Sequence, residues 1–409
     1  MKTLIKNISR LYSPDLKGSF GSVVELSYPS ILIENDKIAK IFHGAFIPKS
    51  LKPDKVIDAK GTCLLPGFVD AHTHPVFWET REQEFIMRLQ GKSYEQIAAA
   101  GGGIRNSARS FRSASKEDIK QRTKERLTVF FEYGTTTIEA KSGYGLSTED
   151  EIKALEIIAE LNREFPLQME ATFLGAHEIP DEYQNNRLAY IQLIIEEMIP
   201  QVATRHLAKY CDVFCEKGVF SLEETRVILE AAESHGLKAR IHADELNSFR
   251  AAELAAEMHA LSADHLVKVS DEGIIALAHA GVIPILLPIT TFFLRKDEYA
   301  PARKLIKWGC DIALATDFNP GSAMTQNMQL VWSLAALKMG LLPGEILWAT
   351  TITPAQSLEL GHLIGSVEEG KQADFVLMNI PNLDYLPYHL GINHVFMTIK
   401  KGAIVYIRK

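Results

Sequence analysis

The sequence predicts an α/β fold, a (β/α)8 TIM-like barrel with a small β-sandwich domain built from both chain termini. Three observations support this prediction. The two ends of the chain share short runs in which apolar and polar residues alternate. The region between them alternates short runs rich in β-branched residues with longer stretches of helical periodicity. The length of 409 residues accommodates a barrel of about 250 residues or more and a smaller unit.

Both ends of the chain predict short β-strands of the same style. Near the N-terminus, apolar and polar positions alternate at residues 30–34 and 37–42. Residues 373–378 and 395–399 repeat this pattern, and a Lys-Gly turn leads into a last apolar run. We therefore assign residues 1–62 and 363–409 to one composite β-sandwich domain and residues 63–362 to the barrel.

The central region predicts eight β-strands separated by helices. Residues 149–161 and 222–232 show helical periodicity. An open, doubly wound sheet is the alternative to a closed barrel, but no GxGxxG motif follows the first strand, which weakens that alternative. The eight candidate strands lie near Phe68, Thr137, Thr172, Val213, Ile241, Ala263, Ile285 and Leu314.

Composition and charge favour a small-molecule partner. Lys plus Arg number 44 against 51 Asp plus Glu, a formal charge of −7, which disfavours a nucleic-acid-binding surface. The apolar stretch 281–294 contains two prolines and is shorter than the ~20 residues that span a bilayer. The N-terminus offers no secretory apolar core, and the four cysteines are too few for a disulfide framework. We expect reduced cysteines and a cytoplasmic location.

Residues 64–75 form an apolar run that ends in two histidines two positions apart, His72 and His74. In an extended strand, side chains at positions i and i+2 point to the same face. At the C-terminal mouth of a barrel, both imidazoles could therefore reach one metal ion. Two polar residues at a strand end are the plainer alternative, and this motif by itself leaves both open.

Three further predicted strands end in possible donors, His242, His265 and Asp317. Active sites of this fold collect residues from the C-terminal ends of several strands, so the combination favours a shared site. Asp264 and Asp244 compete with Asp317 for the carboxylate role, and we rank both below it. Three histidines and one carboxylate suit zinc or iron, and such an ion lowers the pKa of a water ligand from 15.7 towards ~7.

The whole chain resembles the amidohydrolase superfamily, with the motif at 66–74 and the donors above matching its pattern. A further motif at 370–376 is where such enzymes return to the sandwich of both termini. Within the superfamily, the chain resembles the hydrolases that open 4-imidazolone-5-propanoate to N-formimidoyl-L-glutamate in histidine degradation. The segments that carry this closer resemblance are 81–85, 94–104, 141–146, 172–177, 211–216, 242–245 and 315–322.

The resemblance implies a role for each site residue. It implies a homodimer. It also implies one Zn²⁺ or Fe³⁺ per subunit, because the end of the fourth strand offers no bridging lysine in the expected place, although Lys217 lies nearby. His265 would hold the attacking hydroxide and stabilise the oxyanion. Asp317, His265 and Glu245 all remain candidates for the base. The implied metal ligands are His72, His74, His242 and Asp317, and the implied substrate contacts are Arg81, Tyr144, His177, Glu245, Asn319, Gly321 and Ser322.

Each substrate contact also has a structural alternative. Arg81 fits a substrate carboxylate through its planar fork, whereas most arginines lie solvated at the surface. Tyr144 could pack beneath a turn, and His177 could be a buried structural histidine. For the whole chain, the alternatives are a deaminase of a purine, pyrimidine or related heterocycle, which would use the same metal residues, and a metal-free binding or scaffold protein.

Overall fold

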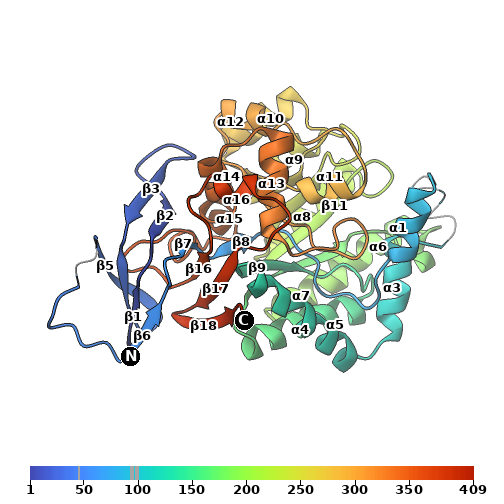
Figure 1. The fold of residues 1–409 in the computed structure, drawn as a ribbon. Helices are drawn as coiled ribbons and strands as arrows, with labels where there is room; N and C mark the ends of the chain where they lie inside the picture. The colour runs from blue at the N-terminus through green and yellow to red at the C-terminus, as the bar shows by residue number, and fades with distance from the viewer. Residues whose placement is uncertain (45–46, 93–95, 97–100) are drawn as a thin grey trace.

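The computed structural model of the chain describes residues 1–44, 47–92, 96 and 101–409. A ring of parallel strands wrapped by helices forms one part, and sheets made of the blue and red ends of the chain form the other (Figure 1). The predicted motif at 94–104 lies partly outside the described residues. The predicted fold class is confirmed.

The barrel is one eight-stranded sheet in which every strand pairs in parallel with its neighbour in the sequence. All eight predicted strand positions fall within these elements, so the prediction of eight βα units is confirmed. The strands are β8 (Phe68–Asp70), β9 (Thr135–Lys141), β10 (Gln168–Ala176), β11 (Tyr210–Cys215), β12 (Lys238–Ala243), β13 (Ser262–His265), β14 (Ile283–Leu286) and β15 (Ala313–Leu314).

The seam between β8 and β15 closes just beyond the two strands. Thr73 and Phe318 form a parallel bridge, and the backbone N–H of His74 donates to the carbonyl of Phe318 at 2.8 Å. Across the same seam, the backbone N–H and hydroxyl of Thr316 donate to the carboxylate of Asp70, the last residue of β8, at 3.0 and 2.6 Å. The two segments predicted to carry metal donors are thus joined to each other at the mouth of the barrel.

The helices between the strands begin at residues that cap them. The hydroxyls of Ser147 and Ser221 accept from backbone N–H groups in the first turns of α5 (Thr148–Glu164) and α8 (Leu222–Ser234), the two helices that the periodicity predicted. The other α-helices of the described residues are α1 (Glu82–Leu89), α3 (Ile104–Ser113), α4 (Lys116–Glu132), α6 (Arg187–Leu193), α7 (Ile199–Thr204), α9 (Ala251–Glu257), α10 (Asp271–Ala280), α11 (Pro288–Phe293), α12 (Ala302–Lys307), α13 (Met328–Met339), α14 (Pro343–Ala349), α15 (Ile352–Ser357) and α16 (Tyr385–Tyr388). The same residues include a 3-10 turn, η1 (Asp181–Tyr183), and a π-helical segment, η2 (Ile194–Met198).

Two sheets form from the ends of the chain. Their strands are β1 (Lys2–Lys6), β2 (Arg10–Pro14), β3 (Val23–Ser27), β4 (Ser30–Glu34), β5 (Lys37–Phe42), β6 (Lys55–Asp58), β7 (Cys63–Pro66), β16 (Phe375–Met378), β17 (Val395–Lys400) and β18 (Ala403–Ile407). β5, β4, β1 and β6 form one sheet, and β18, β17, β16, β7, β2 and β3 form the other. Because β7 pairs with β16 and β2, the terminal sheet reaches past residue 62, into the segment that the sequence assigned to the barrel.

Cysteines and apolar segments take ordinary places in the fold. All four cysteines are free and buried, as expected for core thiols. The apolar stretch 281–294 divides into β14 and the short helix α11. Among the described residues, no helix has the length and apolar character to cross a membrane.

Candidate metal centre and active site

Three histidines converge inside the C-terminal mouth of the barrel. His72 and His74 follow β8, and His242 lies on β12. One ring nitrogen of each lies within 4.8 Å of those of the other two, and the Nε2 atoms of His72 and His74 are 3.3 Å apart. All three side chains are buried. The predicted HxH pair and His242 therefore form one cluster.

Two aspartates orient two of these rings. The Nδ1 atom of His72 lies 2.6 Å from a carboxylate oxygen of Asp264, and the Nδ1 atom of His242 lies 3.0 Å from one of Asp212. A carboxylate accepts hydrogen bonds only, so Nδ1 of each ring carries a proton. Burial lowers the pKa of His72, which therefore keeps the lone pair on Nε2. Burial alone would lower the pKa of His242 too, but Asp212 raises it above its usual value. Carboxylates commonly orient metal-bound histidines in this way. Asp264, a competitor for the carboxylate role in the sequence analysis, thus lies behind a donor histidine as its hydrogen-bond partner.

The geometry fits a metal ion between the three rings. Burial lowers the pKa of His72 and His74 well below the usual value, so both are neutral. Across the 3.3 Å between the two Nε2 atoms, His74 either donates its N–H to His72 or, with its proton on Nδ1, presents a second lone pair that a cation between the rings would accept. Neutral imidazoles suit zinc and iron.

Asp317 lies beside this cluster, directly after β15. One carboxylate oxygen is 3.5 Å from Nε2 of both His72 and His74, and the other accepts from the hydroxyl of Thr290 at 2.5 Å. Burial raises the pKa of Asp317 to about 6. Its φ of 55° lies in the left-handed region, which is uncommon for a residue other than glycine. The backbone therefore changes direction at Asp317, just after the strand ends. Asp244, the other competitor, instead accepts from backbone N–H groups at the start of α9.

His265 and Glu245 form a second pair at the same mouth. The rings of His265 and His242 have centroids 5.2 Å apart, and Nε2 of His265 lies 3.7 Å from a carboxyl oxygen of Glu245. Burial lowers the pKa of His265 well below its usual value. Burial and the nearby Asp317 raise the pKa of Glu245 to about 8, so this carboxyl holds a proton at neutral pH. The site thus contains a buried proton donor beside a neutral imidazole.

His177 and Tyr144 border the cluster on another side. The ring of His177 stacks on that of His74 with centroids 5.3 Å apart, and its Nδ1 donates to the carbonyl of Gly143 at 2.9 Å. Burial lowers the pKa of His177 to about 3. The ring of Tyr144 lies 6.2 Å from that of His74, and burial raises the pKa of its hydroxyl. The resemblance implies that both residues contact substrate, which stays a prediction, and the structure brings both rings beside His74.

Arg81 lies at the rim and is mostly covered by protein. Its Nε and Nη2 atoms donate to the two oxygens of Glu84 at 3.0 and 2.6 Å, and its side chain is 10% exposed. A Cβ added at Gly321 would lie 2.3 Å from Nη1 of Arg81, so a larger residue there would force the guanidinium to shift. The solvated-surface alternative for Arg81 therefore does not hold.

The loop after Asp317 is shaped by Asn319. Its side-chain oxygen accepts from the backbone N–H groups of Gly321 and Ser322 at 2.7 and 2.8 Å, and its amide donates to the carbonyl of Asp317 at 2.7 Å. Asn319 thereby ties the shape of the loop to the position of Asp317. The predicted substrate contacts of this loop stay predictions.

A charged network beneath the cluster was missed by the sequence analysis. The ammonium of Lys141 donates to Glu139 and Asp212 at 2.6 and 2.7 Å, and Arg240 donates to the carbonyl of Ala71 at 3.0 Å. Burial alone would lower the pKa of Lys141, but the neighbouring carboxylates raise it above its usual value. The available signal was a set of charged residues within apolar strands, where an unpaired charge would be costly.

Two other features bear on the site. Lys217, the lysine nearest the end of the fourth strand, is exposed.

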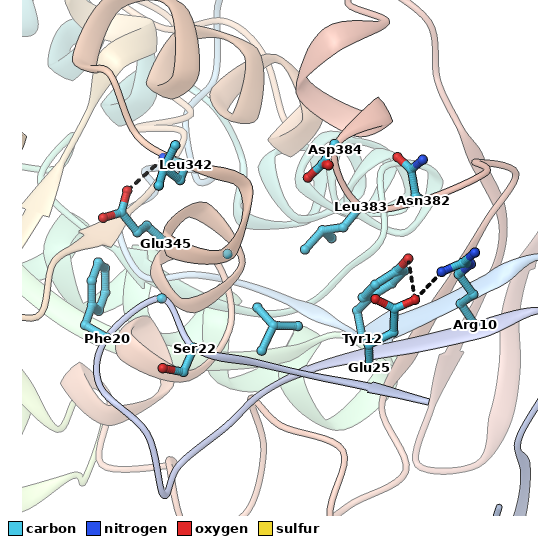
Figure 2. A pocket seen from close by; sticks show the side chains of 13 residues that line it. Arg10, Tyr12, Phe20, Ser22, Glu25, Leu342, Glu345, Asn382, Leu383 and Asp384 are labelled. Carbon is cyan, nitrogen blue, oxygen red and sulfur yellow. Dashed lines mark hydrogen bonds and ion pairs between the residues drawn. The ribbon is translucent and has the colours of Figure 1, made fainter. Parts of the chain in front are cut away.

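An open cavity of about 610 Å³ lies between the β2–β3 hairpin, α14 and the 382–384 segment, away from the histidines (Figure 2). There Glu25 accepts from Arg10 and Tyr12, and Glu345 pairs with Arg303.

The comparisons with known proteins agree with this geometry. The model of the amidohydrolase family matches residues 63–406. An imidazolonepropionase of Treponema denticola is 48% identical over 377 residues, covering 92% of this chain and 91% of that protein. One of Alkaliphilus metalliredigens is 45% identical over 413 residues, covering 98% and 97%. One of Geobacillus thermodenitrificans is 50% identical over 350 residues, covering 86% and 82%.

Solved structures resemble the chain more distantly. Guanine deaminase of E. coli superposes with a TM-score of 0.73 at 16% identity and covers all of both chains. A 5-methylcytosine deaminase of Klebsiella pneumoniae superposes with a TM-score of 0.75 at 16% identity, covering 100% of this chain and 98% of that one. At such identities the similarity shows the fold alone.

Proposed function

The chain belongs to the amidohydrolase family, and from this premise we infer that it hydrolyses 4-imidazolone-5-propanoate to N-formimidoyl-L-glutamate. The observation that carries this inference is the set of relatives named imidazolonepropionase, at 44–50% identity over most of the chain. The reaction adds water across a ring amide, so the ring C–N bond breaks and the ring nitrogen gains a proton. A buried cluster of histidines beside a protonated carboxyl suits both halves of that reaction.

We propose that one Zn²⁺ or Fe³⁺ is held by His72, His74, His242 and Asp317. The short distances among the three histidines and the 3.5 Å approach of Asp317 support this ligand set. When bound, such an ion polarises a carbonyl and lowers the pKa of a water ligand. Because Lys217 is exposed, the end of the fourth strand offers no bridging lysine for a second ion, which supports a count of one.

The other site residues then bind substrate and move protons. Arg81 attracts the propanoate carboxylate from the rim, while Tyr144 and His177 flank the ring. His265 donates a hydrogen bond to the oxygen that develops negative charge. Asp317 accepts the proton of the attacking water. Glu245 carries a proton of its own at neutral pH and donates that proton to the departing ring nitrogen.

The deaminase alternative has less support. Its argument is the similarity to solved deaminases at 16% identity, which concerns the fold. A deaminase of a neutral base would release ammonia and would not need an arginine at the rim. We also propose a homodimer, which the family resemblance suggests, and a cytoplasmic location, which four free thiols suit. Light scattering of the purified protein would measure its oligomeric state.

The test is incubation with freshly generated 4-imidazolone-5-propanoate, following the loss of its ultraviolet absorbance. We expect turnover that stops after treatment with a chelator and returns on adding Zn²⁺ or Fe³⁺. Elemental analysis of the untreated protein would identify the ion. No turnover with fully metal-loaded protein, together with ammonia release from guanine or cytosine, would replace the proposal with the deaminase alternative.

A further inference from the structure

Lys141 occupies an unusual place for a lysine, wholly inside the barrel beneath the histidine cluster. Its side chain is 0% exposed, and its ammonium contacts carboxylates from three different strands. Nζ lies 2.6 Å from Glu139 on its own strand, 2.7 Å from Asp212 on β11 and 3.8 Å from Asp264 on β13. Burying an ammonium is costly unless several partners compensate it, and here three do.

Two of these partners are the carboxylates that orient the metal-binding rings. Asp264 accepts from Nδ1 of His72, and Asp212 accepts from Nδ1 of His242. A single ammonium therefore links the supports of two donor rings that stand on opposite strands of the barrel. Without it, the carboxylates would repel one another at low dielectric and move apart.

Lys141 also reaches the third donor ring through the backbone. Its N–H donates to the carbonyl of Thr73 at 2.9 Å, and Thr73 lies between His72 and His74. Glu139 accepts from the backbone N–H of the same threonine at 3.3 Å. The lysine thus contacts a group that positions each histidine of the cluster. Among the described contacts it makes no hydrogen bond to any of the three rings themselves.

We propose that Lys141 is a positioning residue for the metal centre, which holds Asp212 and Asp264 in place and through them aims the Nε2 atoms of His242 and His72 at one point. The proposal rests on the proposed metal site. Loss of a group that supports a metal ligand typically costs about 10–100-fold in metal affinity, and we expect that loss in Lys141→Met.

A matched control exists in the terminal sheet. Lys400 is also buried and its ammonium lies 2.7 Å from Asp374, but it also contacts Thr137 and Gln168 and none of the histidines. Lys400→Met removes a buried ion pair of the same kind away from the cluster. It is expected to lower thermal stability and leave metal affinity unchanged.

The experiment compares the metal-loaded wild type with both variants. Chelator competition gives the Zn²⁺ affinity of each, and the visible absorption of Co²⁺-loaded protein reports the ligand geometry. We expect weaker Zn²⁺ binding and a shifted Co²⁺ spectrum in Lys141→Met alone. Wild-type affinity and spectrum in Lys141→Met, or an equal loss of affinity in Lys400→Met, would overturn the proposal.

Two further outcomes are distinguishable. Should Lys141→Met not fold, the double variant Lys141→Met/Glu139→Gln removes one charge of each sign and keeps the net charge of the network. It is expected to fold and still bind Zn²⁺ weakly, whereas wild-type affinity in it would refute the role of Lys141. If the wild type itself binds no metal, the proposed metal site fails first, and the positioning role fails with it.

Discussion

The barrel mouth and the core between the terminal sheets are equally buried, yet they are built from opposite kinds of residue. The mouth holds His72, His242 and Asp317, each no more than 3% exposed, whereas the terminal core holds Leu64 and Leu377, both 0% exposed. Burying apolar surface stabilises a fold by about 25 cal/mol per Å², whereas burying polar groups costs free energy unless each finds a partner. We therefore expect substitutions at the mouth to change activity and those in the terminal core to change stability.

The largest expected effect follows from removing a metal ligand at the mouth. His72→Ala removes one proposed donor and leaves Asp264 without its histidine partner. We expect loss of the metal and a fall in kcat/KM of at least about a thousandfold, or ~4 kcal/mol. Metal content per chain and initial rates measure the two losses.

The matched control is His394→Ala, which removes a buried histidine whose Nε2 bonds to the carbonyl of His389, outside the cluster. It should keep the metal and the activity. Asp317→Asn should separate the two roles of that residue, retaining more metal than His72→Ala while losing proton acceptance. A His72→Ala variant with full activity would contradict the proposed centre.

The next effect concerns the proton donor. Because the pKa of Glu245 is raised to about 8, its carboxyl is protonated at pH 7 and loses its proton as the pH rises through 8. We therefore expect kcat to fall as the pH rises through 8, which gives the pH profile a descending limb on its alkaline side. Glu245→Gln should lower kcat at pH 7 by about 10²–10⁴-fold and abolish the limb, since the amide does not titrate. A pH profile of kcat for both proteins tests this, and an unchanged limb in the variant would assign it to another group.

The terminal core should show the opposite behaviour. Leu377→Ala removes a fully buried side chain of β16, for which we expect a loss of about 2–5 kcal/mol in the free energy of unfolding. The kcat and metal content of the folded protein should not change, because Leu377 contacts no residue of the mouth in the core cluster that contains it. Denaturant titration and steady-state rates measure both. A large fall in kcat would show that the two regions are coupled.

The fold and the three histidines could be predicted from the sequence because both follow from short-range patterns. The period of two in residues 72–74 and the βα alternation are local, and the ends of barrel strands converge by topology alone. The bridge between Thr73 and Phe318 is an example of this convergence, since it joins the two segments that carry His72, His74 and Asp317.

The supports of the histidines could not be predicted in the same way. Which carboxylate meets which ring depends on the stagger of strands far apart in the sequence, as in the pair of His72 and Asp264, 192 residues apart. From the sequence, Asp264 looked like a rival ligand, and Asp212 and Lys141 lay in segments that carried the resemblance but were given no role of their own. The pairing of Arg81 with Glu84 is local, since the two residues lie three positions apart at the start of α1. The close approach of Gly321 to Arg81 instead depends on a loop far away in the sequence that has no periodic signal.

The smallest expected effect concerns that rim arginine and tests whether the mouth recognises an anion. Arg81→Met should raise KM for 4-imidazolone-5-propanoate by about 10–100-fold, because charge-assisted hydrogen bonds contribute about 1.5–3 kcal/mol each. For an imidazolone that lacks the propanoate, KM should hardly change. Arg109→Met is the control, since Arg109 is exposed and pairs with Asp181. Equal effects of Arg81→Met on both substrates would mean that Arg81 shapes the loop at Gly321 and does not bind the carboxylate.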